Sequence, residues 1–560
     1  MIYHHTAEKA GLGVSNDFQC VAMAAAIRAR DREGWPGFGN IQGQMNMASA
    51  TKKKKSADLQ FGDFQTPLPL AIQACDVLKS LGVRPAAIVE PTCGIGAFLV
   101  AATQVFPDCQ QLLGFDIHPE YVAATQRMIA SVNTAAAVSL KCQNFFKVSW
   151  KDVLGGLPSP VLLLGNPPWV TNSDQGAGGG ANLPEKSNFQ GHAGLDAITG
   201  KSNFDISEFM LTRLLHAVVG RPAFIGMLVK TAVARKALAF AWKHYAEICD
   251  AAIYQIDAAE HFGAAVDACF LYLQIGTGAE INICRVYQSL ADVKPSHSMA
   301  YEDCQLVSNR DAYSRGRHLH GMERVKWRSG IKHDCASVME LTRTANGCKN
   351  ALGETVPLEP DCLYPMLKSS DVANGNTTAT GRYMLVPQKS TGEQILWMQA
   401  DLPLTWNYLL AHGAALDARG SSIYRNRPRF SIFGVGPYSF APWKIAISGF
   451  YKSLDFRVVG PIEGKPVVMD DTVNFLPFHS RESAEFFCNL LNSPPASDFF
   501  RGSIFWDAKR PVTVDILRRL DLLRLADACG QLALANRLIR DAEGCDTNAA
   551  SDQPNLFSGA

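Results

Sequence analysis

The chain has 560 residues, of which 47% are hydrophobic and 19% are charged. This balance is typical of a folded protein and argues against a disordered chain, and the length favours two domains over one. The 53 basic and 52 acidic residues give a net charge of +1, which neither indicates nor excludes a polyanionic partner. No apolar run reaches the roughly 18 residues of a membrane span and no signal-peptide pattern opens the chain, so we expect a cytoplasmic protein.

The predicted elements fall into four stretches along the chain. Residues 1–60 show little apolar periodicity and are predicted to be a flexible leader. Over 61–320 we expect an α/β domain, because short Val-, Ile- and Leu-rich runs alternate with helical patterns, as in parallel sheets covered on both faces. The shorter, mixed segments of 321–540 predict a second, α+β domain, and the polar residues 541–560 a disordered tail.

The first expected strand runs into a glycine turn, EPTCGIG, at residues 90–96, directly before a predicted helix. Glycines let the backbone approach a ligand closely, and the helix N-terminus supplies free N–H groups. The turn lacks the third glycine of a dinucleotide fingerprint and begins with Glu90, which would repel a pyrophosphate but suit a cationic ligand. The alternative is a tight turn without a ligand.

Three further features complete a predicted nucleoside site. Asp116 ends the next strand, where a carboxylate can accept hydrogen bonds from both hydroxyls of a ribose. Ile117 is expected to press on a nucleobase, and Asn144 and Phe145 to fix the edge of that base. A ligand with a ribose, an amino-acid end and a positive centre is S-adenosylmethionine. Fifteen scattered cysteines without a C-x-x-C pair indicate neither a zinc ribbon nor a disulfide framework, and no metal site is expected.

Another expected strand ends in the residues Asn166, Pro167, Pro168 and Trp169. The exocyclic nitrogen of adenine is a poor nucleophile, and two acceptors that grip its hydrogens would favour a reactive, pyramidal amine. Asn166 Oδ1 and the Pro167 carbonyl are predicted to be these acceptors, because the Pro-Pro pair fixes the backbone in advance. Trp169 is expected to stack on a base extruded from the duplex, a contact worth about 1–3 kcal/mol.

These motifs resemble those of the amino-group DNA methyltransferases that make N6-methyladenine, and their order is similar to the gamma arrangement of restriction-modification methylases. The matching segments are FQTP at 64–67, EPTCGIGAF at 90–98, GFDIHP at 114–119, GNPPW at 165–169 and NFDISEFML at 203–211. Two departures are Trp169, where Tyr or Phe is usual, and Asn144, where Asp is commoner. The resemblance continues through 358–372, 438–444 and 490–496, which look like the specificity domain of that family.

The resemblance implies a Rossmann-like, S-adenosylmethionine-dependent methyltransferase domain, followed by a target-recognition domain over 321–540. It implies double-stranded DNA as the substrate and a cognate restriction endonuclease as a partner, and we expect a monomer. Because the cofactor supplies the methyl group, no covalent nucleophile is needed, and Cys93 is interpreted as a small residue of the turn. The implied cofactor-binding residues are Thr66, Pro67, Glu90, Pro91, Cys93, Gly94, Gly96, Asp116, Ile117, Asn144, Phe145 and Asn166.

Two regions are candidates for contact with DNA. Residues 171–202 are hypothesised to form a lid, in which Lys186 and Lys201 would meet phosphates and Phe204 would cover the base; a disordered surface loop is the alternative. The stretch 418–454 contains no Asp or Glu and mixes basic with aromatic residues. Its predicted DNA contacts are Arg425, Arg427, Arg429 and Lys444. The alternative there is an aromatic core with a solvated basic rim.

The residues leave other functions open. The same carboxamide and Pro-Pro pair would serve RNA adenine-N6 or DNA cytosine-N4 methylation. The side-chain amide of a glutamine in a protein is a further group that could receive the methyl group. The large second domain argues against the glutamine enzyme, which would not need it. A DNA-binding subunit without catalytic activity is an alternative of another class.

Overall fold

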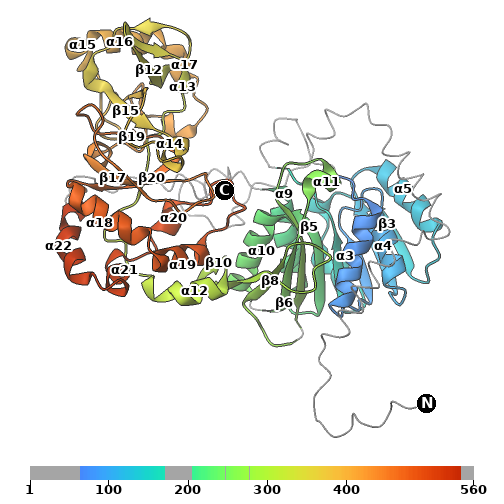
Figure 1. Cartoon of the computed structure of the whole chain (residues 1–560). Coiled ribbons are helices and arrows are strands. Elements are labelled where there is room, and N and C mark those ends of the chain that lie inside the picture. The colour runs from blue at the N-terminus through green and yellow to red at the C-terminus, as the bar shows by residue number, and fades with distance from the viewer. Residues whose placement is uncertain (1–63, 171–204, 246, 277, 544–560) are drawn as a thin grey trace. The chain divides into compact units, whose positions relative to one another are not determined.

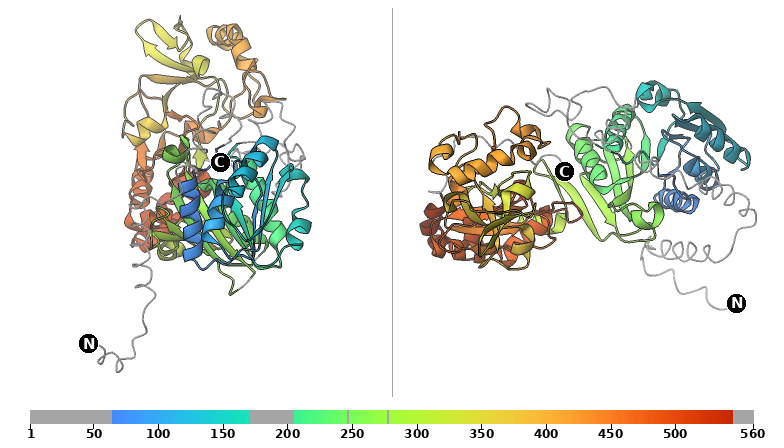
Figure 2. Two further views of the ribbon diagram at one scale, coloured as in Figure 1. Left: turned by 90° about the vertical axis from the view of Figure 1, so that its right-hand side faces the viewer. Right: turned by 90° about the horizontal axis from the view of Figure 1, so that it is seen from above.

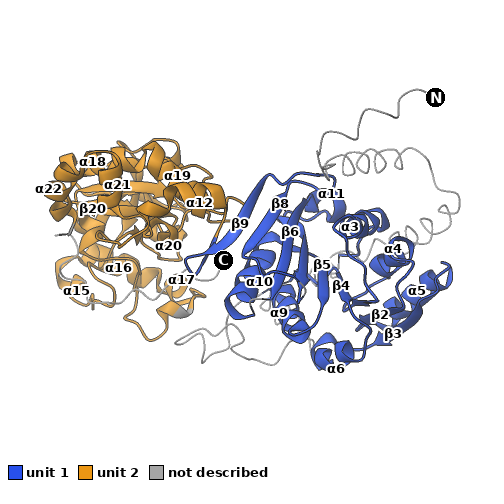
Figure 3. Cartoon of the chain, turned by 90° about the horizontal axis from the view of Figure 1, so that it is seen from below, with its two compact units in different colours: residues 1–306 blue, residues 307–560 orange. Residues whose placement is uncertain are grey.

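The computed structural model describes residues 64–170, 205–245, 247–276 and 278–543, in two compact units of residues 1–306 and 307–560 (Figure 1; Figure 3). The division lies earlier than the boundary expected after residue 320. The reason is that Ser308 N and Asn309 N already donate to Gly502 O, at 2.9 and 3.3 Å, within unit 2. The predicted leader 1–60 and the hypothesised lid 171–202 lie outside the described residues.

Unit 1 is built on a ten-stranded sheet in the order β10-β9-β8-β6-β7-β5-β4-β1-β2-β3. The strands β3, β2, β1, β4 and β5 run parallel to one another, while β7 runs antiparallel to both β5 and β6. The bounds are β1 (Ala87–Glu90), β2 (Gln111–Asp116), β3 (Ala137–Cys142), β4 (Val161–Gly165), β5 (Ala223–Lys230), β6 (Ile248–Ile256), β7 (Ala268–Ile275), β8 (Ile283–Tyr287), β9 (His297–Glu302) and β10 (Gln305–Val307). Strands β1 and β4 are buried along their whole length, as is usual in the middle of a parallel sheet.

Helices cover both faces of this sheet (Figure 2). On one face, α3 (Leu68–Ser80), α4 (Ala97–Val105) and α5 (Pro119–Ala130) pack in sequence, and α6 (Trp150–Gly155), α9 (Ile206–Val218) and α10 (Thr231–His244) form the other layer (Figure 3). The short helices η2 (Phe145–Lys147) and α11 (Ala258–Phe262) follow β3 and β6. The predicted Rossmann-like α/β sheet is confirmed; the sequence did not predict the mixed parallel and antiparallel pairing of its other end, from β6 to β10.

The strand order reverses between β1 and β4. From β1 the chain continues to β2 and β3 on one side, and from β4 to β5 on the other. Because β1 and β4 are paired in parallel, their carboxyl ends lie side by side, and ligands of open α/β sheets bind at such a reversal. The segment after β4 and the start of α9 lie next to each other, since Ile206 N donates to Val170 O at 2.9 Å.

Unit 2 contains a four-stranded sheet, β11-β20-β17-β18, and a six-stranded sheet, β14-β13-β12-β16-β15-β19. The strands are β11 (Arg328–Ser329), β12 (Glu340–Thr344), β13 (Gly347–Asn350), β14 (Thr355–Val356), β15 (Leu363–Leu367), β16 (Arg382–Leu385), β17 (Trp443–Ser448), β18 (Arg457–Val459), β19 (Val468–Met469) and β20 (Val473–Phe478). The helices are α12 (Arg310–Gly316), α13 (Ala336–Met339), α14 (Ser369–Ala373), α15 (Met398–Asp401), α16 (Pro403–Ala411), α17 (Gly413–Asp417), α18 (Arg481–Leu491), α19 (Pro494–Ser503), α20 (Val514–Leu517), α21 (Leu522–Ala528) and α22 (Leu532–Glu543).

The mixed strands and helices agree with the α+β domain expected there. Residues 541–543 do not belong to a tail as expected, because α22 continues to Glu543 and buries Leu538, Ile539 and Ala542. Residues 544–560 lie outside the described part of the chain. Among the described helices, none has the length and apolar character needed to cross a membrane.

Candidate active site

Asn166 directly follows β4, and its side-chain amide is held in one orientation. The amide nitrogen Nδ2 donates to Phe64 O at 3.0 Å and to Thr66 Oγ1 at 3.3 Å. A backbone carbonyl can only accept, so the nitrogen and not the oxygen must face Phe64. The other atom, Oδ1, is buried and has no hydrogen-bond partner among the described residues. Leaving a buried acceptor unpaired costs about 1–3 kcal/mol, which a donor supplied by a ligand would recover.

Glu90, the last residue of β1, is a second buried acceptor. It is 3% exposed, and its Oε2 has no partner in the described part of the chain. Burial raises the pKa of this carboxyl well above its usual range; a hydrogen bond to the Leu99 backbone lowers it in part, and nearby Asp116 raises it. None of the described groups that shift this pKa is basic. Within the described ranges the carboxyl therefore has no cationic partner, and the sulfonium and ammonium groups of S-adenosylmethionine supply positive charge of this kind.

The glycine turn between β1 and α4 lies where the sequence predicted it. Gly94 and Gly96 adopt φ angles of 50° and 86°, in the left-handed region that favours glycine. A Cβ atom on Gly96 would lie 2.6 Å from Thr125 Cγ2, so a larger residue does not fit there. Cys93 is 4% exposed, and burial raises the pKa of its thiol. A buried, protonated thiol is a poor nucleophile, which agrees with the interpretation of Cys93 as a structural residue.

Asp116 ties the end of β2 to the glycine turn. Its Oδ2 accepts from Gly94 N and its Oδ1 from His118 N, both at 2.9 Å. The neighbouring Ile117 is 38% exposed, as a side chain that covers a nucleobase would need to be. The ribose contact of Asp116 and the base contact of Ile117 stay predictions.

The cofactor and catalytic motifs meet in one small cavity. It is lined by Pro91, Thr92, Phe145, Pro167, Met210, Leu211, Leu214 and Met227. Asn144 lies just before it as the N-cap of η2, with its Oδ1 accepting from Phe146 N at 2.8 Å. Pro67 is the N-cap of α3, and Pro168 is half-buried beside Pro167. The structure thus brings together residues that lie about 75 positions apart in the chain, as the crossover of parallel strands requires.

Trp169 does not lie as the sequence interpretation expected. It is 5% exposed, and its Nε1 donates to Leu228 O at 3.3 Å. Its ring centroid lies 5.5 Å from that of Phe64 and 5.1 Å from that of Phe262, in tilted and edge-on arrangements. The indole is therefore part of the packed core, and stacking on a base, which stays a prediction, would require the neighbouring rings to give way.

Replacing Trp169 with Ala is expected to lower the free energy of unfolding by about 3–5 kcal/mol, because it empties a buried aromatic site. Trp169→Phe keeps most of the buried surface and should lose clearly less. Chemical denaturation of the two variants measures the difference. An alanine variant as stable as the unaltered protein would contradict this packing.

The sequence interpretation missed two residues of the site. Gln65 Oε1 accepts from Ile95 N at 3.0 Å, so the segment before α3 also touches the glycine turn. Phe262, at the end of α11, is half-buried against Trp169 and lies 5.9 Å from Phe64, measured between ring centroids. Neither contact follows from local sequence spacing; the position of Gln65 inside the FQTP segment was the one available signal.

The candidates for DNA contact have mixed outcomes. Phe204, Lys186 and Lys201 lie outside the described residues. The structure corrects the expectation for Lys444, which lies in β17, is 1% exposed and donates from Nζ to Ala441 O at 2.5 Å. A side chain so buried cannot meet a phosphate, and its ammonium instead satisfies a backbone carbonyl.

The arginines before β17 remain on the surface. Arg425, Arg427 and Arg429 are exposed, and Arg429 forms an ion pair with Asp417 at 2.8 Å. The Arg427 guanidinium lies 5.8 Å from the centre of the Phe433 ring. The nearby aromatic residues Phe430, Phe433 and Tyr438 are buried, so the aromatic-core alternative holds for them while the arginines stay accessible.

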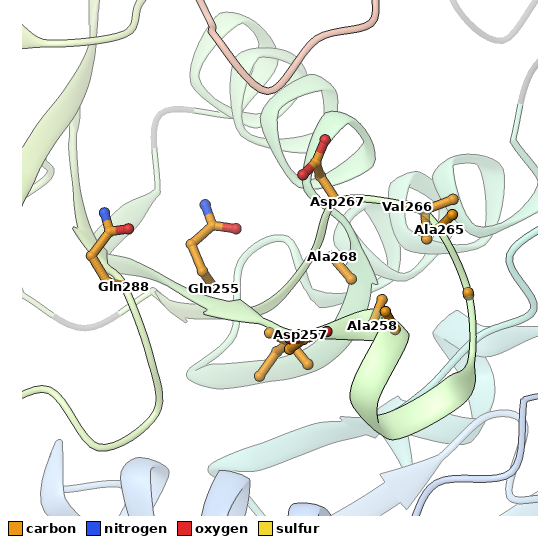
Figure 4. A pocket seen from close by; sticks show the side chains of 11 residues that line it. Gln255, Asp257, Ala258, Ala265, Val266, Asp267, Ala268 and Gln288 are labelled. Atoms are coloured by element: carbon orange, nitrogen blue, oxygen red, sulfur yellow. The ribbon is translucent and has the colours of Figure 1, made fainter.

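A second hollow opens at the same edge of the unit 1 sheet (Figure 4). It has a volume of about 430 Å³ and lies at the ends of β6 and β8 and the start of β7. Its polar lining comes from Gln255, Asp257, Asp267 and Gln288, and its apolar lining is largely alanine. Two carboxylates make this hollow unfavourable for a phosphate group.

Comparison with known proteins places these features in a family. No family model matches the chain. It is 45% identical over 469 residues to the type II methyltransferase M.NspV of Nostoc sp. (strain ATCC 29411 / PCC 7524). The match covers 84% of this chain and 97% of the relative. It is 28% identical over 164 residues to the type II methyltransferase M.XamI of Xanthomonas campestris pv. amaranthicola, 29% of each chain.

Among solved structures, the fold is similar to that of the type IIL restriction-modification enzyme MmeI in complex with DNA. The TM-score is 0.51 at 13% sequence identity, and the match covers 87% of this chain and 73% of that chain. The fold, the paired buried acceptors at the ends of β1 and β4 and the relationship to M.NspV agree. The chain therefore belongs to the type II methyltransferases, and its cofactor is S-adenosylmethionine.

Proposed function

We propose that this protein transfers a methyl group from S-adenosylmethionine to the N6 amino group of adenine in double-stranded DNA. The observation that carries the proposal is the buried Asn166 Oδ1, which has no hydrogen-bond partner in the part of the chain that the structure describes and lies next to the strand end that presents Glu90. The motif order supports the gamma arrangement, and the family supports a role as the modification enzyme that protects DNA from a cognate nuclease.

The side chains of the site divide the work between them. Glu90 offers a buried carboxyl to the cofactor, whose positive charge favours the ionised form that burial alone disfavours, and the methyl sulfonium is the electrophile of the reaction. Asn166 Oδ1 accepts one N–H of the target amine, and the Pro167 carbonyl accepts the other. Two preset acceptors hold the nitrogen lone pair towards the methyl group without reorganisation during the reaction. The target base must leave the duplex to reach them.

Product analysis tests this proposal. The protein is incubated with tritiated S-adenosylmethionine and, separately, with plasmid DNA, RNA and protein acceptors, and labelled DNA is digested to nucleosides. We expect label in DNA alone, as N6-methyldeoxyadenosine. Cytosine carries an exocyclic amine that the same acceptors fit, so N4-methyldeoxycytidine as the labelled product would overturn the adenine assignment. Label in RNA or glutamine would overturn the choice of DNA, and DNA binding without turnover would indicate a non-catalytic subunit.

The exposed Arg427 is proposed to contact the DNA phosphates. Arg427→Ala is expected to weaken DNA binding at low salt and to reduce the slope of log affinity against log salt by about 1, because one phosphate contact is lost. Arg501→Ala, which removes an exposed charge from α19, serves as the matched control and should change neither quantity. Fluorescence anisotropy over a salt series measures both variants; an unchanged slope for Arg427→Ala would contradict the placement.

A further inference from the structure

Three successive residues before α3 bridge the two halves of the site. We call Phe64, Gln65 and Thr66 the bracket. The bracket accepts both hydrogen bonds from Asn166 Nδ2, through Phe64 O at 3.0 Å and Thr66 Oγ1 at 3.3 Å. Between these two residues, Gln65 Oε1 accepts from Ile95 N at 3.0 Å. One short segment therefore touches the catalytic amide and the cofactor turn.

The two acceptors on Asn166 Nδ2 have separate effects. Phe64 O decides which end of the amide is turned towards it, since an oxygen there would meet another acceptor. Thr66 Oγ1 takes the second N–H of the same nitrogen. An amide with both of its N–H groups engaged has its plane fixed, so the direction of Oδ1 is set before any substrate is present. Thr66 is 8% exposed, which keeps water from competing for this bond.

The glycine turn makes room for the bracket. A Cβ atom on Gly94 would lie 2.4 Å from Gln65 Oε1, and the φ angle of Gly94 is 50°. The absence of a side chain at Gly94 therefore serves the approach of Gln65 as well as the backbone conformation of the turn. The same Oε1 atom accepts the hydrogen bond from Ile95 N, so this contact holds the bracket against the turn.

We propose that Thr66 is a positioning residue that acts through Asn166, and that Gln65 anchors the bracket to the cofactor turn. The proposal rests on the proposed function, because it assumes that Asn166 Oδ1 accepts a hydrogen of the target amine. It assigns the Thr66 hydroxyl to the catalytic amide, whereas the family resemblance implied a contact with the cofactor.

The test compares Thr66→Val, which keeps the shape of the side chain but loses the acceptor, with Thr66→Ser, which keeps the hydroxyl. We expect Thr66→Val to lower kcat about 10-fold, the effect of one hydrogen bond, with the Kd for S-adenosylmethionine and the KM for DNA within about two-fold. Thr66→Ser should restore most of kcat. Unchanged kcat in Thr66→Val, or equal losses in both variants, would overturn the proposal.

Gln65→Ala should have the opposite pattern of effects, because it should change cofactor binding rather than kcat. It frees Ile95 N in the turn and should weaken S-adenosylmethionine binding about 3- to 10-fold, measured by calorimetry in the absence of DNA. Thr66→Val should leave that affinity unchanged. If Thr66→Val instead weakens cofactor binding and keeps kcat, Thr66 is a cofactor ligand and the positioning role is wrong. Thermal unfolding of each variant shows whether it is folded.

The outcome is separable from that of the proposed function. Each variant is compared with the unaltered protein on whichever base that protein methylates. A product of N4-methyldeoxycytidine would refute the adenine assignment, yet the Thr66 comparison would keep its meaning, because both exocyclic amines need the same oriented acceptor.

Discussion

Asn166→Ala is expected to lower kcat for DNA methylation by a factor on the order of 10²–10³, the usual loss for one preorganised hydrogen bond in a transition state. The physical reason is that the variant removes Oδ1, the buried oxygen that has no partner among the described residues. Cofactor binding should change by less than about two-fold, because S-adenosylmethionine needs no contact with that oxygen in the proposed arrangement.

Radioactive methyl transfer and isothermal calorimetry with S-adenosylmethionine measure the two quantities for Asn166→Ala. The matched control is Asn133→Ala, which truncates an exposed carboxamide in the same unit and should leave both unchanged. A methylation rate within a few-fold of the unaltered protein would show that Asn166 Oδ1 does not hold the target amine. Another group would then have to hold the target amine in the transition state.

Glu90→Gln is expected to have two effects of opposite sign. The folded-state pKa of this carboxyl is raised, so its contribution to stability is fully present below the unfolded pKa and is lost as the pH rises through the folded pKa. The cofactor-free protein should therefore lose stability relative to Glu90→Gln as the pH is raised from below the unfolded pKa of a glutamate through the higher folded-state pKa, since the variant carries no charge to desolvate. Thermal unfolding across that range measures the difference.

The same variant should bind S-adenosylmethionine about 10- to 100-fold more weakly, because a charge-assisted hydrogen bond contributes about 1.5–3 kcal/mol. A gain in stability together with a loss of affinity distinguishes a ligand-binding carboxyl from a structural one. Glu280→Gln neutralises an exposed carboxylate of unit 1 and should show neither effect. Equal cofactor affinity for Glu90→Gln and the unaltered protein would show that Glu90 is buried for another reason.

The backbone of the site was predictable from the sequence, because it depends on local signals. Glycines at the end of a short apolar run predicted the turn at Gly94 and Gly96, and the alternation of strands and helices placed Asn166 at the same edge as Glu90. These features follow from the residue types at the turn and from the hydrophobic periodicity of the strand and the helix. Both signals lie within a few residues of one another in the sequence.

The contacts of individual side chains were not predictable in the same way. Lys444 counted as a surface charge because lysine is rarely buried, but its strand places it in the interior of unit 2. Trp169 was expected to be accessible, whereas Phe64 and Phe262 enclose it from segments about a hundred residues away in each direction. The bond from Ile95 N to Gln65 likewise depends on tertiary packing, which no local pattern encodes.

The hydrogen bond from Ile206 N to Val170 O ties the catalytic segment to a second element of the fold. Val170 follows Asn166 by four residues, and Ile206 is the first residue of α9. The carboxamide is therefore held from its C-terminal side by a helix as well as from its N-terminal side by β4, and a change in α9 that breaks this bond would loosen the backbone that aims it.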